Sequence, residues 1–167
     1  MITITDEVLV RADLLVVFDC IWDATCWPRL TTHVKRIEML ESEKCQQRFL
    51  MTIESNGKEH TVESFREAEP GRCIRYRQIR PPIFLKEHTG EWQFVPVADG
   101  VRVDLTHCAI IDYEKALPAF AASSPAEAEE VVSNALKVNG SKTLLAIKRH
   151  LEQGPTEGFP VASTTQG

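Results

Sequence analysis

The chain has 167 residues, the size of one domain, and such a length buries roughly two thirds of the surface that the unfolded chain exposes. Its net charge of −5 and pI of about 5.6 argue against nucleic-acid binding, because phosphate recognition normally requires a basic face. No apolar run approaches the roughly 20 residues that span a bilayer, and residues 1–10 lack the basic start and long apolar core of a signal peptide. We therefore expect no nucleic acid, no membrane and a cytoplasmic location.

The spacing of cysteine and histidine residues bears on metal and disulfide chemistry. The five cysteines are odd in number and contain no C-x-x-C pair, so we expect reduced thiols. The five histidines show neither H-x-x-x-H nor H-x-H spacing. We predict a site that works without a metal or another cofactor.

The N-terminal part predicts a strand followed by helices. Residues 3–10 alternate in polarity, and residues 12–24 carry apolar side chains at helical spacing, with Asp13 in the first turn where it suits the helix dipole. Trp27-Pro28 then interrupts the helix, because a residue before proline avoids the helical region. A short second helical turn or loop is expected after this break.

The middle of the chain predicts an antiparallel meander. Turn residues at Asn56-Gly57, Pro70-Gly71, Pro81-Pro82 and Asp99-Gly100 separate segments of alternating polarity. The predicted strands are 34–42, 45–54, 58–69, 72–80, 84–97 and 101–112. One face of such a sheet must be covered by another element.

A long C-terminal helix is predicted to supply that cover. Ser124, Pro125 and Glu127 form a capping box, and one helical face carries Val132, Leu136, Gly140, Leu144, Ile147 and Leu151. If it ends at Gln153, the helix is roughly 40 Å long. We expect one domain over residues 1–153 and a disordered tail over 154–167, which has few core formers.

The strand 58–69 is the most informative segment. Period-two alternation places His60, Val62, Ser64 and Arg66 on one face, and Glu59, Thr61, Glu63 and Glu67 on the other. Arg66 thus points away from the glutamates of its own strand, toward the drier face. This predicts a guanidinium inside a pocket. The alternative is a structural ion pair of Arg66 with Asp104 or Asp112.

The order of elements resembles the helix-grip architecture of the START and birch-pollen-allergen superfamily. Within it, the chain is most similar to the tetracenomycin-type polyketide aromatase/cyclases. This resemblance rests on Trp27-Pro28-Arg29-Leu30, Ser64-Phe65-Arg66, Glu91-Trp92 and Asn139. It implies an α+β fold in which a curved antiparallel sheet of about seven strands wraps around the long C-terminal helix, with two short helices after the first strand and an internal cavity.

The resemblance also implies an activity and roles for individual residues. The activity is cofactor-independent aldol cyclisation and dehydration of a linear poly-β-ketone bound to an acyl carrier protein of a polyketide synthase. In the family, the arginine matching Arg66 is the principal catalytic residue, and the residues matching Ser64, Trp27 and Trp92 line the cavity. The chain departs from the family at Val34, where a tyrosine is usual, at His60 and Val62, where tryptophans are usual, and at Gln78, where a second arginine is usual.

Further residues are candidates by their chemistry and direction. A guanidinium stabilises a developing enolate oxygen, and Ser64 on the same face can position it. His60, Tyr76 and His107 can exchange protons, and we predict His60 as a third catalytic residue beside Arg66 and Ser64. The predicted substrate-binding residues are Trp27, Trp92, Tyr76, Phe49, Gln78, His107 and Asn139. Trp22 is expected in the core.

A basic cluster stands out in this acidic chain and is a candidate docking surface for an acidic acyl carrier protein. Its members are Arg72, Arg75, Arg77, Arg80 and Lys86.

Two other functions fit the same architecture, because a fold does not fix a function. The first is a non-catalytic carrier of a lipid, quinone or other apolar molecule, which has no need of an inward arginine. The second is a stabilising subunit of a synthase complex, which predicts a filled cavity. Oligomeric state, substrate length and the carbons that are joined stay open at this level.

Overall fold

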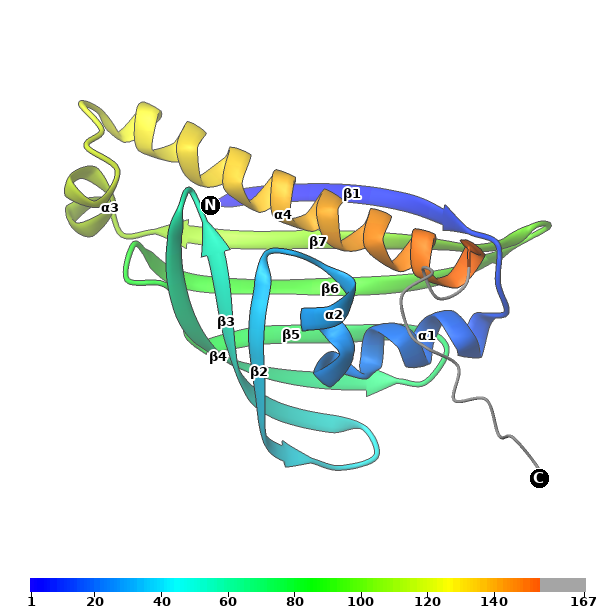
Figure 1. Cartoon of the computed structure of the whole chain (residues 1–167). Helices are drawn as coiled ribbons and strands as arrows, with labels where there is room; N and C mark the ends of the chain where they lie inside the picture. Colours follow the sequence, from blue (N-terminus) through cyan, green and yellow to red (C-terminus); the bar gives the residue numbers. More distant parts are fainter. Residues whose placement is uncertain (154–167) are drawn as a thin grey trace, which may run out of the picture.

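The computed structural model describes residues 1–153, and within them seven strands form one antiparallel sheet that curves around a long helix (Figure 1). The elements are β1 (Ile2–Val10), α1 (Leu14–Trp22), the short 3-10 helix η1 (Ala24–Cys26), α2 (Trp27–Leu30), β2 (Val34–Ser42), β3 (Gln46–Ser55), β4 (Lys58–Glu69), β5 (Cys73–Arg80), β6 (Leu85–Val97), β7 (Gly100–Ile111), α3 (Tyr113–Ala119) and α4 (Pro125–Gln153). The predicted helix-grip fold is confirmed.

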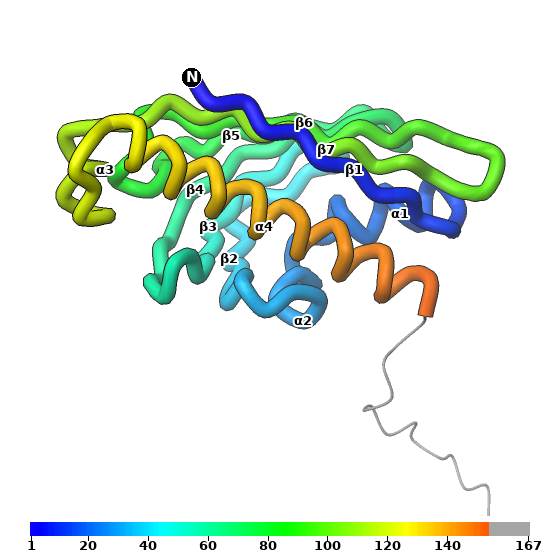
Figure 2. Tube along the Cα trace, turned by 90° about the horizontal axis from the view of Figure 1, so that it is seen from above, coloured from blue at the N-terminus to red at the C-terminus, as the bar shows by residue number. Residues whose placement is uncertain are grey.

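The sheet is a meander of six strands to which the first strand is added at one edge. Its order is β1-β7-β6-β5-β4-β3-β2, so consecutive strands are neighbours except that β1 pairs with β7. Seen from above, α4 crosses the hollow side of the sheet diagonally, and α1 and α2 lie beside its C-terminal half (Figure 2). The sheet therefore has an inner face toward α4 and an outer face away from it.

Local sequence signals explain the turns and the start of α4. Asn56 and Gly57 both have positive φ, as a two-residue hairpin requires. The Glu127 N–H donates to Ser124 Oγ at 3.2 Å, which confirms Ser124 as the cap. The Glu127 carboxylate accepts from the N–H of Ser123 rather than from that of Ser124, at 2.8 Å. One of the two hydrogen bonds of the predicted capping box is therefore present, and the other comes from Ser123 in place of Ser124.

Most predicted boundaries agree with the structure within one or two residues, but α3 is an addition. No element is predicted for residues 113–119, which contain Pro118 and only one buried residue, Ala116. Helix α3 packs through Leu117 and the following Phe120 onto a small cluster with Leu85 and Ile111. Its formation depends on this tertiary contact, because a helix of two turns is marginal alone. The expected tail, 154–167, lies outside the described residues.

Two hydrophobic clusters hold α4 to the sheet, one at each end. The larger lies under the C-terminal half, where Leu144 and Ile147 meet Val103 and Val10. The smaller lies under the N-terminal half, where Ala128 and Val132 meet residues at the ends of β6 and β7. Between them α4 presents Gly140, which has no side chain to fill the space. None of the helices in residues 1–153 is long and apolar enough to cross a membrane.

Candidate active site

One row of paired residues across the inner face assembles the site. Arg66 on β4 pairs with Tyr76 on β5, Tyr76 with Gly90 on β6, and Gly90 with His107 on β7. Because residues opposite one another in an antiparallel sheet point to the same side, all three side chains face α4. The next row brings Phe49 beside Ser64 and Ser64 beside Gln78. The strand register therefore places predicted site residues of β3, β4, β5 and β7 next to one another on the inner face.

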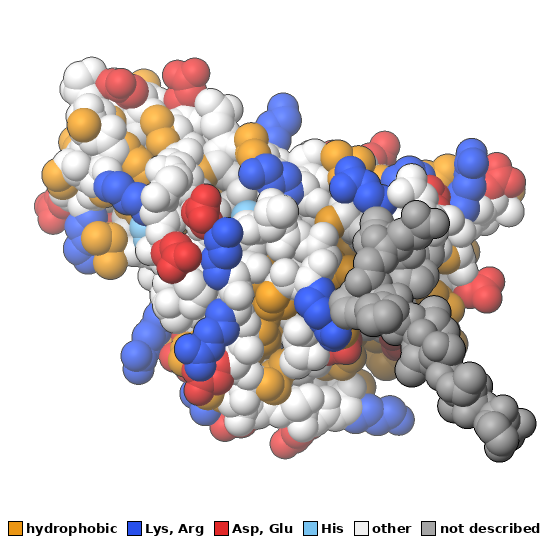
Figure 3. Space-filling model, viewed as in Figure 1, with side chains coloured by type: hydrophobic (Ala, Val, Ile, Leu, Met, Phe, Trp, Pro, Cys, Tyr) orange, Lys and Arg blue, Asp and Glu red, His pale blue; other side chains and the backbone are white. Residues whose placement is uncertain are grey.

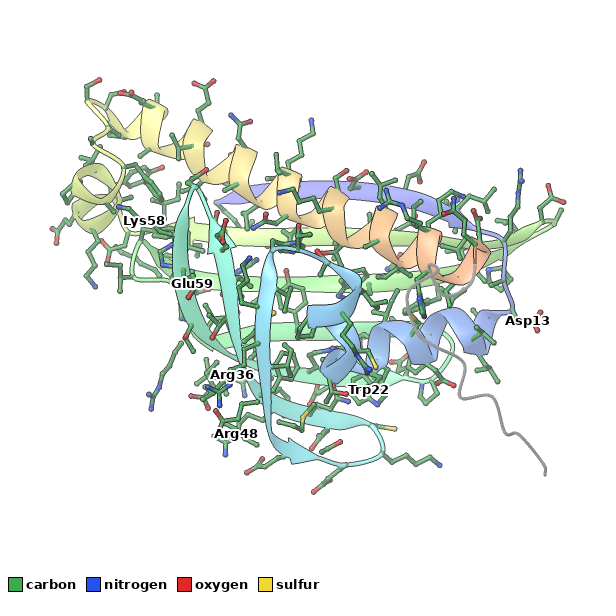
Figure 4. The ribbon with its side chains drawn as sticks, viewed as in Figure 1. Asp13, Trp22, Arg36, Arg48, Lys58 and Glu59 are labelled. Carbon is green, nitrogen blue, oxygen red and sulfur yellow. The ribbon has the colours of Figure 1, made fainter. Side chains whose placement is uncertain are left out.

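Arg66 is buried, with 2% of its surface exposed, and no residue of 1–153 that is buried to this degree has a larger side chain. Its Nη2 donates to the carbonyl of Ile21 at 2.7 Å. That carbonyl lies in the last turn of α1, where backbone oxygens have no helical partner and the dipole is negative. The guanidinium carbon also lies 5.0, 5.1 and 5.7 Å from the ring centroids of Trp22, Trp27 and Phe49. Figure 4 shows Trp22 at the end of α1, facing the sheet.

The charge of Arg66 is left without a carboxylate partner among residues 1–153. The alternative of an ion pair with Asp104 or Asp112 is wrong, because Asp104 binds Arg102 at 2.9 Å and Asp112 binds Lys115 at 3.3 Å. Burial lowers the pKa of Arg66 to about 9, and the more distant Asp23 opposes that shift. The guanidinium is therefore a cation at neutral pH, held by a carbonyl and aromatic faces.

Several polar atoms of the cavity have no hydrogen-bond partner among the described residues. They are the N–H groups of Arg66 Nε, Arg66 Nη1 and Trp27 Nε1, together with Gln78 Oε1 and His107 Nε2. Buried polar groups are ordinarily paired. A cluster of unpaired ones around a single space is what a polar ligand requires. This set offers donors near Arg66 and an acceptor on Gln78.

Tyr76 is held by two histidines. Its hydroxyl lies 3.1 Å from His88 Nε2 and also hydrogen-bonds His107 Nδ1. Burial lowers the pKa of His88 to about 3 and that of His107 to about 4, and it raises the pKa of the Tyr76 phenol. All three groups are thus neutral near pH 7.

His88 is one of the cavity residues that the sequence did not single out, with His33 and Thr143. It lies four residues before Trp92 on β6, and residues two and four apart on a strand share a face. Extending the alternation from Trp92 through Gly90 would have placed it inside.

Gly90 explains how the Tyr76 ring reaches His107 across an intervening strand. A Cβ built on Gly90 would lie 2.3 Å from Tyr76 Cε1 and 2.4 Å from the carbonyl oxygen of Thr106. Such distances are impossible, so only glycine lets the phenol ring lie flat over β6 at this point. Gly140 plays the matching part on α4, where a Cβ would lie 3.0 Å from His107 Nε2.

These residues surround a cavity of about 110 Å³ between sheet and α4. Apart from His60, every predicted site residue lines it: Arg66, Ser64, Trp27, Trp92, Tyr76, Phe49, Gln78, His107 and Asn139. His33, His88 and Thr143 line it as well. Trp22 instead packs against the core, as expected.

His60 lies in a smaller adjoining recess of about 40 Å³. Its ring packs edge-on against Phe84, with centroids 5.5 Å apart, and burial followed by Lys58 lowers its pKa. The recess shares Gln78, His88 and Asn139 with the larger cavity. His60 thus points inward as predicted but is not brought to Arg66, and its catalytic role stays a prediction.

A polar groove of about 360 Å³ adjoins the cavity between the start of β2, the β3–β4 turn and α4. The two spaces share His33 and Asn139. The groove carries Lys35, which binds Glu54 at 3.2 Å, and Lys142, for which the described part of the chain provides no ion-pair partner. Burial, then Lys142 and Lys35, lowers the pKa of His33 to about 4. Figure 3 views this side of the molecule and shows basic side chains over α4.

The basic cluster predicted for docking lies largely on the outer face. Arg75 binds Glu91 at 2.7 Å, Arg72 binds Glu69 at 3.3 Å, and Arg80 binds Glu63 at 3.3 Å. Arg77 lies over the ring of Phe65. Most of these charges thus have a carboxylate beside them, and the role of the cluster as a docking surface stays a prediction.

A long helix gripped by a curved sheet over a cavity with a buried cation defines a small-molecule site of the helix-grip class. The chain belongs to the family described as polyketide cyclase / dehydrase and lipid transport, whose model matches residues 1–152.

Relatives in Streptomyces agree with this assignment. The chain is 32% identical over 95 residues to a granaticin polyketide synthase bifunctional cyclase/dehydratase from Streptomyces virginiae, covering 56% of this chain and 31% of that one. It is 27% identical over 130 residues to an actinorhodin polyketide synthase bifunctional cyclase/dehydratase from Streptomyces coelicolor, covering 71% of this chain and 36% of that one. The chain thus spans about a third of the length of these curated relatives.

Solved structures give the same picture. The di-domain aromatase/cyclase BexL of the BE-7585A biosynthetic pathway matches with a TM-score of 0.84 at 29% identity, over 92% of this chain and 51% of that one. The Zhui aromatase/cyclase from Streptomyces sp. R1128 matches with a TM-score of 0.79 over 93% of this chain and 99% of that one, and at 22% identity it supports the fold alone.

Proposed function

We propose that this protein directs the intramolecular aldol cyclisation and dehydration of a linear poly-β-ketone, without a cofactor. The observation that carries the proposal is the buried Arg66, a cation beside the cavity with two nitrogens that have no hydrogen-bond partner among residues 1–153. A buried charge without an anion costs stability, and a carrier of apolar molecules has no use for it. A substrate that develops negative charge on oxygen would be stabilised by this cation.

The cation would act on the enolate. Removal of a proton between two carbonyl groups places negative charge on oxygen, and donors fixed in a dry site stabilise that charge far better than water does. Arg66 offers Nε and Nη1, and Trp27 Nε1 is a further unpartnered donor. Ser64, two residues from Arg66 on the same face, is placed to bind a neighbouring carbonyl.

His107 is the group best suited to take the carbon-bound proton. Its Nδ1 is occupied by Tyr76, whereas its Nε2 has no partner among residues 1–153. With a pKa of about 4 it is neutral and free to accept a proton at neutral pH. Gln78 Oε1 would accept a hydrogen bond from an enol of the bound chain.

The cavity volume limits what can be enclosed. A cavity of roughly 150 Å³ holds one benzene molecule, so a space of about 110 Å³ encloses only part of the segment that closes into one ring, and not a whole poly-β-ketone. The remainder of the chain would extend into the adjoining groove. The aromatic walls, Trp27, Trp92 and Phe49, would keep that segment bent.

The partner that we infer is an acyl carrier protein of a polyketide synthase. Carrier proteins are acidic and present the acyl chain on a phosphate-bearing arm, so they require cations where the arm enters. Lys142, which has no ion-pair partner among the described residues, meets this requirement at the groove, whereas Lys35 beside it binds Glu54 and the outer-face arginines Arg75 and Arg80 are also paired.

The test is reconstitution with a minimal polyketide synthase and its carrier protein, with products compared for wild type, Arg66→Met, Arg66→Lys and no added protein. We expect a new aromatic product with wild type and a loss of roughly 10²–10³ in its rate with Arg66→Met. Arg66→Lys keeps the charge but not the planar fork, so an intermediate rate is expected. Arg77→Met, on the outer face, is the matched control.

An identical product profile in all these samples would reject the cyclase for this substrate class. Tight binding of an apolar probe to wild type and to Arg66→Met alike would then favour the carrier function.

A further inference from the structure

Closing a ring leaves a β-hydroxy ketone, and aromatisation must then remove water. In the proposed function, Arg66 Nε and Nη1 hold the anionic oxygen of the substrate, so a second group has to deliver a proton to the departing oxygen. Loss of hydroxide needs a proton donor that stays protonated and reaches the cavity. The proposed function leaves this donor unassigned.

We propose that Tyr76 is the catalytic acid that protonates the departing hydroxyl group, and that His88 is the positioning residue that holds its phenol. This inference rests on the proposed function and assigns its second half. Tyr76 stands next to Arg66 in the cross-strand row and lines the same cavity. A substrate oxygen held by Arg66 therefore has neighbouring atoms within the reach of the phenol.

The hydrogen bonds define what each partner does. With the Nδ1–H of His107 donating to the Tyr76 oxygen, the phenol O–H is directed to His88 Nε2 at 3.1 Å. His88 is buried at 7% exposure, and its ring packs edge-on against Tyr76 with centroids 5.5 Å apart. It fixes the phenol both by packing and by accepting its hydrogen bond in the resting state.

The elimination balances within this group. The Cα–H bond breaks, its proton passes to His107 Nε2, and its electron pair forms the Cα=Cβ bond. The Cβ–O bond breaks, and its electron pair leaves with the oxygen, which takes the Tyr76 proton to become water. The Nδ1 proton of His107 passes to the Tyr76 oxygen, so both residues end neutral and His107 has exchanged one tautomer for the other. After product release, exchange with water restores the first tautomer.

Gly90 and Gly140 support a catalytic role for Tyr76 and His107. Gly90 gives the Tyr76 ring its path over β6, and Gly140 lets His107 lie close under α4. A phenol needed only to fill space would not require a glycine on the neighbouring strand. Burial also keeps the phenol protonated, because it raises the pKa of Tyr76.

The experiment separates ring closure from water loss. Two substrates are used: the carrier-bound poly-β-ketone made in the reconstituted system, and a synthetic β-hydroxy ketone thioester that only has to lose water. Tyr76→Phe keeps the ring and removes the acid. We expect it to slow dehydration by roughly 10²–10⁴ and to slow ring closure far less, so that a product heavier by one water accumulates. Tyr113→Phe, on exposed α3, is the matched control and should leave the ratio of the two products unchanged.

His88 is tested by a variant and its rescue. His88→Leu should lower kcat for dehydration by about tenfold with little change in KM, and His88→Gln, which retains an acceptor, should recover part of that loss. His150→Leu, on the exposed last turn of α4, serves as the control. Circular dichroism and thermal unfolding establish that each variant folds.

Equal slowing of ring closure and dehydration by Tyr76→Phe, or no slowing of either, would overturn the inference. The synthetic substrate keeps the two proposals distinguishable. If wild type fails to cyclise the poly-β-ketone but dehydrates the synthetic thioester through Tyr76, the proposed ring closure fails and the acid stands. If cyclisation depends on Arg66 but Tyr76→Phe leaves dehydration unchanged, the proposed ring closure stands and Tyr76 is not the acid.

Discussion

Most arginines on the outer face of the sheet have carboxylate partners, whereas the buried arginine on the inner face, Arg66, has none among residues 1–153. On the outer face Arg48 binds Glu41 and Glu63 at 2.9 and 2.8 Å, and Arg75 and Arg80 also meet carboxylates. On the inner face Arg66 is nearly inaccessible and contacts a carbonyl and three aromatic rings. Figure 4 shows Arg36 and Arg48 on the outside of the sheet, away from the cavity. Outer charges are matched with partners in place, whereas the inner charge is left available for a ligand.

The difference separates stability from function. Replacing a buried ion by a well-packed apolar residue is often neutral or stabilising, whereas removing one partner of a buried pair destabilises. The inner and outer arginines should therefore respond to the same substitution with opposite signs.

The largest effect is expected from Arg66→Met. Besides the activity loss described above, we expect the free energy of unfolding to rise by about 1–4 kcal/mol, because an unpaired buried cation is replaced by an apolar chain of similar length. Urea unfolding at pH 7 measures it. A clear loss of stability would mean that the contacts with Ile21 and the aromatic rings outweigh the cost of burial.

Arg48→Met is expected to destabilise the protein, because it removes the ion pairs of Arg48 with Glu41 and Glu63 on the outer face. The Glu63 side chain is only 8% exposed, and this variant leaves it with Arg80 alone at 3.3 Å. We expect the melting temperature to fall by several degrees, and Glu63→Gln in the same chain to restore part of it. Calorimetry of the two single variants and the double variant gives the coupling. Complete additivity of the two substitutions would argue against the pair.

Acid should weaken the inner face through its histidines. His88 and His107 have folded-state pKa values of about 3 and about 4, below the value of about 6.5 in an unfolded chain. The unfolded state therefore binds more protons below pH 6.5, and stability falls as the pH drops toward 4. At pH 5 the loss relative to pH 7 is about 2 kcal/mol for each histidine. His33, whose pKa is also about 4, adds a loss in the same direction, so urea unfolding at both pH values should show about two thirds of the total loss in His88→Leu and the full loss in His150→Leu. Identical pH dependence in both variants would contradict the role of burial.

The smallest effect is expected at the groove. Lys142→Gln should raise KM for the carrier-bound substrate by roughly three- to tenfold, with a smaller effect at high salt. KM for a short thioester without the phosphate should not change. Lys137→Gln, an exposed lysine of α4 outside the groove, is the control. Equal responses of Lys142→Gln and Lys137→Gln would indicate only a general charge effect.

Alternation within one strand was enough to predict the inward Arg66 and Ser64, because period two is a property of the local backbone. Turn chemistry fixed the Asn56-Gly57 hairpin in the same way. The Tyr76 pair with His88 and His107 was not predictable as a group, because it depends on the register of three strands and on a missing Cβ at Gly90. Neutralisation of Arg75 by Glu91 likewise depends on which residues face each other across strands.

Helix α3 shows the same limit for secondary structure. Its seven residues have no clear apolar periodicity and contain a proline, so local signals are weak. Contacts of Ala116 and Leu117 with the smaller core cluster decide the outcome. Tertiary packing therefore supplied what the local sequence lacked.

The pairing of β1 with β7 has a consequence for how the molecule is made. Ile2 pairs with Ala109, so β1 is synthesised well before the strand that covers its edge. Helix α4 comes later still. Sheets built from such distant pairs fold in milliseconds to seconds, and until then the apolar inner face is exposed to aggregation. Production of this enzyme candidate should therefore depend on slow synthesis and on chaperones more than its final stability suggests.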